Sequence, residues 1–284
     1  MLAKFLFMLF NMNMKIMPVN TYQTKQPNFQ SCFRVYASES LKNTKCFRTD
    51  LVRTSTNLFR EDLDWFGLAK FIKTHFADKK KVNIYSMACS DGSEAYTMAI
   101  SLFENLPEEL HSKFLPIIAS DIDTKVLDLA KTRRINIEPV EFWSPERMYN
   151  CRLDKYFKNP RSTMMLDGDV ISESDTMLSY QPIYKLAYAV NFHKADILSG
   201  LNKLEDDGNS VVMCRNVFPY LSDAYTDEVV HAAKNKLKKG SLFITGDYDA
   251  YSKDLDVKLL NNDFCQSLKM KSRFLDCSNI FEHV

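Results

Sequence analysis

Acidic side chains occur where the ligand-binding loops of α/β proteins are usually found. Asp91 and Glu94 follow one short apolar stretch, and Asp121 follows the next. Residues at the carboxyl ends of neighbouring parallel strands line one crevice. The first loop holds a single glycine, Gly92, and no Lys or Arg occurs over residues 82–112. A phosphate group would therefore meet two carboxylates without a compensating cation, so a dinucleotide is a poor fit.

The phosphate-binding motifs G-x-G-x-x-G and G-x-x-x-x-G-K-[ST] are both absent. A nucleoside that carries positive charge suits these acids better. S-adenosylmethionine has a ribose, a sulfonium and an ammonium group, so Asp121 would bind ribose hydroxyls and Glu94 the ammonium. Each acid also has a structural explanation, because Asp121 and Asp123 can cap a helix and Glu94 can face a helix dipole. Together, at the ends of two strands, they favour a ligand.

Such loops require a scaffold in which strands and helices alternate. Short apolar stretches predict the strands, and apolar residues at helical spacing predict the helices. The predicted strands are 82–87, 114–120, 186–192, 211–216 and 241–246, and the predicted helices are 62–76, 95–106, 124–134 and 222–239. This alternation is typical of a doubly wound, mostly parallel, Rossmann-like α/β sheet.

Residues 136–185 interrupt the alternation and are too long for an ordinary connection. We expect a small inserted β-subdomain there, with a helix over 145–157 and short antiparallel strands. The main domain is then expected to span 54–284. Residues 1–53 are expected to form a short basic N-terminal arm or a truncated helical region.

The N-terminal region carries most of the positive charge. Residues 1–60 hold nine Lys or Arg and two Asp or Glu, about +7, so the remainder of the chain carries about −6 of the overall +1. Such an arm suggests an acidic partner, or a solvated tail. The opening apolar run, MLAKFLFMLF, is shorter than the roughly 20 residues of a membrane span. We therefore expect a cytoplasmic protein without stable membrane insertion and without a nucleic-acid partner.

The cysteines and histidines do not form a metal-binding pattern. The seven cysteines are odd in number, and no C-x-x-C pair or Cys/His cluster occurs. This spacing favours a reducing compartment and no structural zinc. The five scattered histidines add no metal signature, so no metal site is expected.

Four segments, in this order, resemble the chemotaxis receptor methyltransferase (CheR) family: "TNLFRED", "IYSMACSDGSEAYTMAI", "IIASDIDTKVLDLAK" and "MCRNVFPYL". Members of that family are S-adenosylmethionine-dependent protein-glutamate O-methyltransferases. A further segment, "SPERMYNCRLDKYF", resembles the lead into the family's small β-subdomain. The resemblance covers about residues 54–250. It implies a methyltransferase that acts on glutamate carboxylates of chemoreceptors, or of another protein that carries acceptor glutamates.

The resemblance also implies a set of site residues. Those that would bind the cofactor are Thr56, Arg60, Ala88, Glu94, Asp121, Asp196, Ile197, Arg215 and Asn216. Arg60 would pair with the cofactor carboxylate and Glu94 with its amino group. Asp196 and Ile197 replace the family's Asn-Leu pair near the adenine. Tyr220 matches the tyrosine close to the transferred methyl group.

The expected reaction needs no general base, since a glutamate has a pKa of about 4.3 and is ionised at neutral pH. Positioning and the exclusion of water should dominate the rate. Arg215 is our candidate for orienting the acceptor carboxylate. Tyr220 would wall or polarise the path of the methyl group.

Several positions depart from the family pattern. Thr54 replaces Asn, Ala95 replaces Pro, Pro219 replaces an aliphatic residue, and Gly246-Asp247-Tyr248-Asp249 replaces G-H-S-E. These departures would affect the choice of acceptor more than the binding of the cofactor. Two alternatives stay open: a methyltransferase of the same fold with another acceptor, and a catalytically weak module that binds the cofactor or docks to receptors.

Overall fold

The computed structural model describes residues 35–36, 46, 53–54, 56–60, 62–137, 145–146, 148–162, 178–246 and 280–283. The predictions for the N-terminal arm lie mostly outside these ranges, and so do residues 247–249 of the altered G-H-S-E element. The contacts divide the chain into two units, 1–32 and 33–284. The elements described below belong to the second unit.

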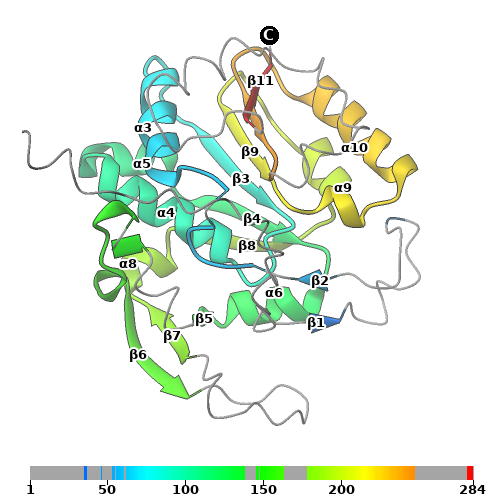
Figure 1. Ribbon diagram of the computed structural model, residues 1–284. Helices are drawn as coiled ribbons and strands as arrows, with labels where there is room; N and C mark the ends of the chain where they lie inside the picture. The colour runs from blue at the N-terminus through cyan, green and yellow to red at the C-terminus, as the bar shows by residue number, and fades with distance from the viewer. Residues whose placement is uncertain are drawn as a thin grey trace, which may run out of the picture. The chain divides into compact units, whose positions relative to one another are not determined.

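Within the described ranges, a six-stranded sheet forms the centre of this unit (Figure 1). Its strand order is β11-β10-β9-β3-β4-β8. The strands are β3 (Asn83–Met87), β4 (Ile117–Asp121), β8 (Val190–Lys194), β9 (Ser210–Cys214), β10 (Leu242–Ile244) and β11 (Ile280–Glu282). All neighbours are parallel except β10 and β11, which are antiparallel. The predicted mostly parallel α/β sheet is therefore confirmed.

The chain order of the strands fixes where a ligand can lie. From β3 the chain adds β4 and β8 on one side, and it then crosses to add β9 and β10 on the other. The reversal leaves a crevice between β3 and β9, outside the carboxyl ends of the strands. All five residues of β9 are buried, which is typical of a strand covered on both faces.

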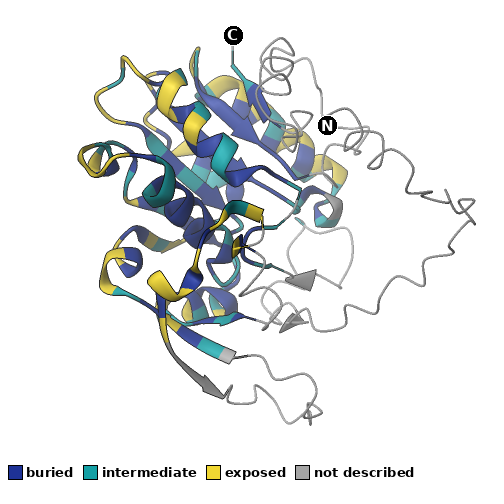
Figure 2. Cartoon of the chain, turned by 60° about the vertical axis from the view of Figure 1, so that its left-hand side comes forward, coloured by how far each residue is buried: buried dark blue, intermediate teal, exposed yellow. Residues whose placement is uncertain are grey.

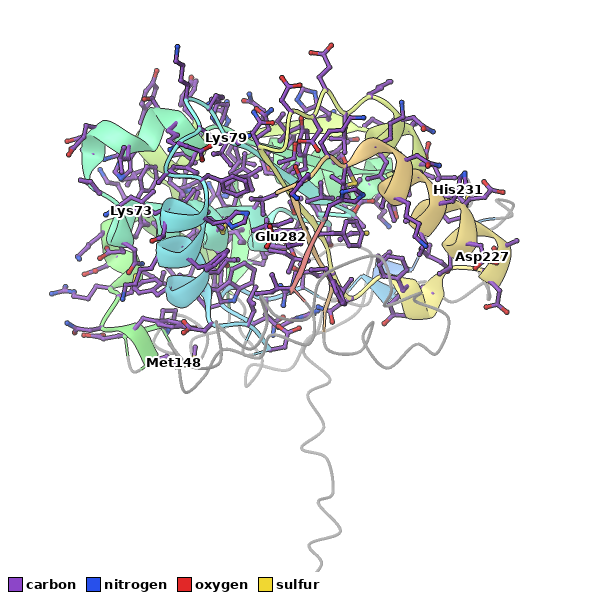
Figure 3. The ribbon with its side chains drawn as sticks, turned by 90° about the horizontal axis from the view of Figure 1, so that it is seen from above. Lys73, Lys79, Met148, Asp227, His231 and Glu282 are labelled. Carbon is purple, nitrogen blue, oxygen red and sulfur yellow. The ribbon has the colours of Figure 1, made fainter. Side chains whose placement is uncertain are left out.

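Helices cover both faces of the sheet. They are α3 (Trp65–His75), α4 (Ser93–Asn105), α5 (His111–Phe114), α6 (Thr124–Lys131), α8 (Tyr184–Ala187), α9 (Ile197–Asn202) and α10 (Asp223–Lys236). Figure 3 shows α3, which carries Lys73, on one side of the sheet and α10, which carries Asp227 and His231, on the other. Two apolar clusters result, one under α3 and α4 and one under α9 and α10. Buried residues gather along the strands between them (Figure 2).

Helix ends follow their capping residues. Asp64, Asp123, Asp196 and Ser222 each accept a hydrogen bond from a backbone N–H of the helix that follows. The prediction that Asp123 caps a helix is confirmed. The helix predicted over 62–76 begins at Trp65 because Asp64 caps it, and the one predicted over 222–239 ends at Lys236.

A second sheet lies in the range where a β-subdomain was expected. Its described strands are three, antiparallel and in the order β5-β7-β6, with β5 (Ile135–Ile137), β6 (Phe157–Ser162) and β7 (Leu178–Pro182). The predicted continuous helix over 145–157 is wrong. Asn150 adopts a left-handed backbone conformation, with φ of 54°, that ends the helical segment. A 3₁₀ turn at Leu153–Lys155 then leads directly into β6.

The strands β1 (Val35–Tyr36) and β2 (Arg53–Thr54) form an antiparallel pair, so residues on both sides of the expected domain boundary at residue 53 are joined.

Within the described ranges, every helix falls short of the length and apolarity that a membrane span requires.

Candidate functional site

A pocket lies at the carboxyl ends of β3, β4, β8 and β9. It is lined by every site residue that the sequence predicts: Thr56, Arg60, Ala88, Glu94, Asp121, Asp196, Ile197, Arg215, Asn216 and Tyr220. These residues come from five separate segments of the chain, and the parallel sheet brings them together. Their predicted roles stay predictions, because the geometry fixes their places and not their ligands.

The loop between β3 and α4 forms one wall and is held in an unusual conformation. Ala88, Ser90 and Gly92 all have positive φ angles, of 57°, 50° and 92°. Such conformations cost free energy for non-glycine residues and cluster at functional sites. The Cys89 N–H donates to the Ser120 carbonyl at 2.9 Å, which ties the loop to the end of β4.

Gly92 allows the loop to pass close to β8. A Cβ atom at this position would lie 2.7 Å from Cζ of Phe192, and the φ of 92° disfavours any side chain. The single glycine of the loop is therefore explained by a close approach and a left-handed turn, and not by a phosphate.

Asp121 is a buried acceptor at the end of β4. Its Oδ2 accepts from the Ser90 N–H and its Oδ1 from the Asp123 N–H, both at 2.8 Å. Burial raises the pKa of Asp121 to about 6, although these N–H bonds act in the opposite direction. The carboxylate is thus oriented by the backbone and able to accept further hydrogen bonds on its remaining lone pairs.

Asp123 adds a second acceptor that the sequence reasoning treated only as a helix cap. Its Oδ1 accepts from the Lys125 N–H at 2.9 Å. Its Oδ2 is buried and has no hydrogen-bond partner among the described residues. Because Asp123 also lines the pocket, this oxygen suits a ligand hydroxyl.

Arg215 binds two carboxylates. Its Nη1 donates to Oε2 of Glu94 at 3.2 Å, and its Nη2 donates to Oδ1 of Asp62. The guanidinium carbon lies 4.7 Å from the centre of the Trp65 ring, and the Arg215 side chain is 1% exposed. Ser86 Oγ donates to Oε1 of Glu94 at 2.7 Å. The guanidinium is therefore fixed from several directions.

Asp62 was missed by the sequence reasoning. It follows the Arg-Glu of "TNLFRED", and nothing in the local pattern sets it apart from a solvated acid. Asn216 donates to its Oδ2 at 3.4 Å. A Cβ atom on Gly246 would lie 2.3 Å from Oδ1 of Asn216, so a side chain at this first residue of the altered 246–249 element would displace the Asn216 amide.

The opposite wall contains Asp196, which caps α9. Its Oδ1 accepts from the Ser199 N–H at 2.8 Å and from the Tyr225 hydroxyl at 3.2 Å. Burial alone would raise the pKa of Asp196, but these hydrogen bonds outweigh it and hold the pKa below its usual value. Tyr225 and Cys46 also line this wall, and neither was predicted. The Cys46 carbonyl accepts from the Ser222 N–H at 2.8 Å.

The pocket is acidic overall. Among the described residues that line it, four are carboxylates, at Glu94, Asp121, Asp123 and Asp196, and two are arginines, at Arg60 and Arg215. These six carry a formal charge of −2 when all are ionised, and the described part of the lining contains no lysine. Such a site favours a cationic ligand over a phosphate.

Comparison with known proteins bears on the identity of this site. Residues 54–163 match the model of the family described as CheR methyltransferase, SAM binding domain. The resemblance to the CheR family is confirmed. The CheR match includes the loop after β3 and Asp121, and it supports S-adenosylmethionine as the cofactor. Asp196, Arg215, Asn216 and Tyr220 lie beyond it.

Three CheR-like relatives illustrate the extent of the similarity. The chain is 27% identical over 172 residues to chemotaxis protein methyltransferase 2 of Vibrio cholerae, covering 61% of this chain and 52% of that protein. It is 25% identical over 221 residues to a chemotaxis protein methyltransferase of Salmonella typhimurium, covering 76% and 67%. The corresponding protein of Listeria monocytogenes is 24% identical over 217 residues, covering 74% and 71%. The chain thus spans about half the length of the Vibrio relative.

Similarity to solved structures is weak by comparison. An S-adenosylmethionine-dependent methyltransferase from Clostridium acetobutylicum is 17% identical, with a TM-score of 0.29, covering 66% of this chain and 52% of that one. A likeness at this level adds nothing to the description of the CheR-like site.

Proposed function

We propose that this protein is an S-adenosylmethionine-dependent methyltransferase that esterifies glutamate side chains of chemoreceptor proteins. The observation that carries the proposal is the buried Asp121 carboxylate at the end of β4, within a pocket of net negative charge. The CheR match over 54–163 supports the cofactor. The relatives named chemotaxis protein methyltransferases support the acceptor.

The residues present fit the cofactor. Asp121 and the buried Oδ2 of Asp123 offer acceptors for ribose hydroxyls, and Glu94 offers one for an ammonium group. Arg60 would pair with the carboxylate of the methionine part. Bound S-adenosylmethionine would supply a methyl group on a sulfonium. The excess of carboxylates in the lining would stabilise that charge.

Asp196 and Ile197 would border the adenine. A carboxylate at Asp196 accepts hydrogen bonds and donates none at neutral pH, so it would suit an exocyclic amino group. Its Oδ1 already accepts from Ser199 and Tyr225. These contacts hold the carboxylate in place where the CheR family has an asparagine.

The acceptor carboxylate requires orientation and not deprotonation, because a glutamate is ionised at neutral pH. Holding a nucleophile in line with its target is worth up to roughly 7–11 kcal/mol. Tyr220, which lines the pocket and is partly exposed, would form one side of the acceptor's path. The hydrophobic side chains of Val217 and Leu221 lie beside it and would help to exclude water.

Arg215 takes a different part in this proposal from the one that the sequence suggested. Both of its terminal nitrogens donate to carboxylates of the protein itself, at Asp62 and Glu94. Its side chain is almost fully buried. We therefore assign it to positioning Glu94, and its role in orienting the acceptor remains an untested prediction.

The test is transfer of a labelled methyl group from S-adenosylmethionine to a purified cytoplasmic fragment of a chemoreceptor. A methyl ester releases labelled methanol in mild base, whereas an N-methyl or C-methyl product keeps its label. The proposal predicts base-labile label that is lost when the acceptor glutamates of the fragment are replaced by alanine. Base-stable label would identify another acceptor atom and would overturn the ester assignment.

A further inference from the structure

Three charged side chains lie in contact beside the pocket: Asp62, Arg215 and Glu94. Arg215 lies between the two carboxylates and donates one terminal nitrogen to each. Its Nε is buried without a hydrogen-bond partner among the described residues. The guanidinium is thus turned toward the two acids even though this orientation leaves one donor unsatisfied.

Burial strengthens the electrostatic effect of these three side chains on a neighbouring ligand. The side chains of Arg215, Asp62 and Glu94 are 1%, 12% and 13% exposed. Solvent screens charges poorly in such surroundings, so an excess charge is felt by any ligand beside it. The Trp65 ring, 4.7 Å from the guanidinium carbon, holds the cation in position.

The charge count shows what Asp62 contributes. Among these three side chains, one guanidinium and two carboxylates sum to −1. With Asp62 neutral, Arg215 would be left to pair with Glu94 alone, and the group would carry no net charge. Glu94 lines the pocket and is the residue placed to meet an ammonium group, which a neutral group would attract only weakly.

We propose that Asp62 is a positioning residue that competes with Glu94 for Arg215 and so keeps Glu94 available to a cationic amino group. It would thereby select ligands whose amino-acid part carries an ammonium. This inference rests on the proposed function, because it takes the ligand to be S-adenosylmethionine or its demethylated product.

The test compares two ligands that differ only in the ammonium group: S-adenosylhomocysteine and its analogue without the amino group. Their affinities for the full chain are measured by calorimetry with wild type and with Asp62→Asn, which keeps the shape and removes the charge. We expect Asp62→Asn to lower the affinity for S-adenosylhomocysteine about tenfold. The affinity for the deaminated analogue should stay within about twofold, because that ligand has no cation to lose.

Two further variants separate charge from structure. Asp64→Asn changes a nearby acid that caps α3, and asparagine caps equally well, so ligand discrimination should not change. The double variant Asp62→Asn with Arg215→Gln returns the group to −1 and should regain part of the discrimination that Asp62→Asn loses. Circular dichroism and thermal melting establish that each variant is folded.

The outcomes are distinct. If Asp62→Asn lowers the affinity for both ligands equally, or for neither, the proposed role of Asp62 is overturned. A further loss of discrimination in the double variant would overturn the charge argument. If folded wild-type protein binds neither ligand, the proposed function itself fails.

Discussion

The Ser90 N–H donates a 2.8 Å hydrogen bond to Oδ2 of Asp121. This bond joins the loop after β3 to the end of β4, across the edge of the sheet where the pocket opens. Ser90 makes this bond from a left-handed conformation, with φ of 50°. The protein thus maintains local strain to orient one buried carboxylate, which is characteristic of a preorganised binding site.

Ligand affinity should depend on pH through Asp121. Burial raises its pKa to about 6, and the ribose hydroxyls would donate to its ionised form. Affinity for S-adenosylhomocysteine should therefore rise with pH through 6, and calorimetry should find it about tenfold weaker at pH 5 than at pH 7. Asp123 and the Cys89 thiol face the same Asp121 carboxylate. Burial raises the pKa of the Cys89 thiol well above its usual value, so the thiol stays neutral between pH 5 and pH 7.

Asp121→Asn provides the control for this pH dependence. The amide nitrogen would meet the N–H of Ser90 or Asp123, so affinity should fall at every pH. The step near pH 6 should disappear. A step of the same size in the folded variant would assign the titration to another group.

Gly92→Ala should destabilise the protein and distort the loop. The new Cβ would lie 2.7 Å from Phe192 Cζ at a φ of 92°, and such strain costs about 1–3 kcal/mol. Gly200→Ala is the matched control. Gly200 lies in the helix α9, and a Cβ atom there would lie 3.4 Å from Cε of the flexible Met87 side chain. Urea unfolding should show a lower free energy of unfolding for Gly92→Ala alone. Equal stabilities for the two variants would contradict the loop geometry.

Tyr220 should affect turnover more than cofactor affinity. Removal of the ring in Tyr220→Ala would open the acceptor's path, and a misplaced acceptor costs on the order of 100-fold in rate. The affinity for S-adenosylhomocysteine, measured by calorimetry, should change by no more than about threefold, because the lost stabilisation is confined to the transition state. Tyr220→Phe shows whether the ring or the hydroxyl is responsible. A parallel fall in affinity and rate would make Tyr220 part of the cofactor site instead.

The segment around Cys46 should contribute to cofactor binding. Cys46 lines the pocket, and its carbonyl accepts from the Ser222 N–H at 2.8 Å. Deletion of residues 1–50 should therefore weaken binding of S-adenosylhomocysteine, whereas deletion of residues 1–32, a separate unit by contacts, should leave it unchanged. Unchanged affinity in the longer deletion would show that Cys46 is only a neighbour of the site.

Much of the fold could be predicted because the strands of a covered parallel sheet are continuous apolar runs. β9, with all five residues buried, is the clearest case. The strand expected over 186–192 shows the limit of this signal. Leu186 and Ala187 are buried within the short helix α8, and the strand begins only at Val190. Apolar runs do not distinguish a buried helical turn from a strand.

The site could be predicted where its residues belong to local motifs and not where they depend on distant partners. Asp121 follows a strand, and Glu94 opens a helix. Asp62 gains its significance from meeting Arg215, 153 residues further along the chain. Cys46 reaches the pocket through a backbone contact that has no local signature.

Titration of the full chain with S-adenosylhomocysteine directly tests whether the acidic pocket binds the proposed cofactor. We expect saturable binding at one site per chain, with no comparable binding of NAD, because the pocket is acidic and lacks a phosphate-binding loop. Asp121→Asn should weaken this binding while the protein remains folded. Absence of binding to folded wild-type protein, or tighter binding of NAD than of S-adenosylhomocysteine, would show that the pocket is not an S-adenosylmethionine site.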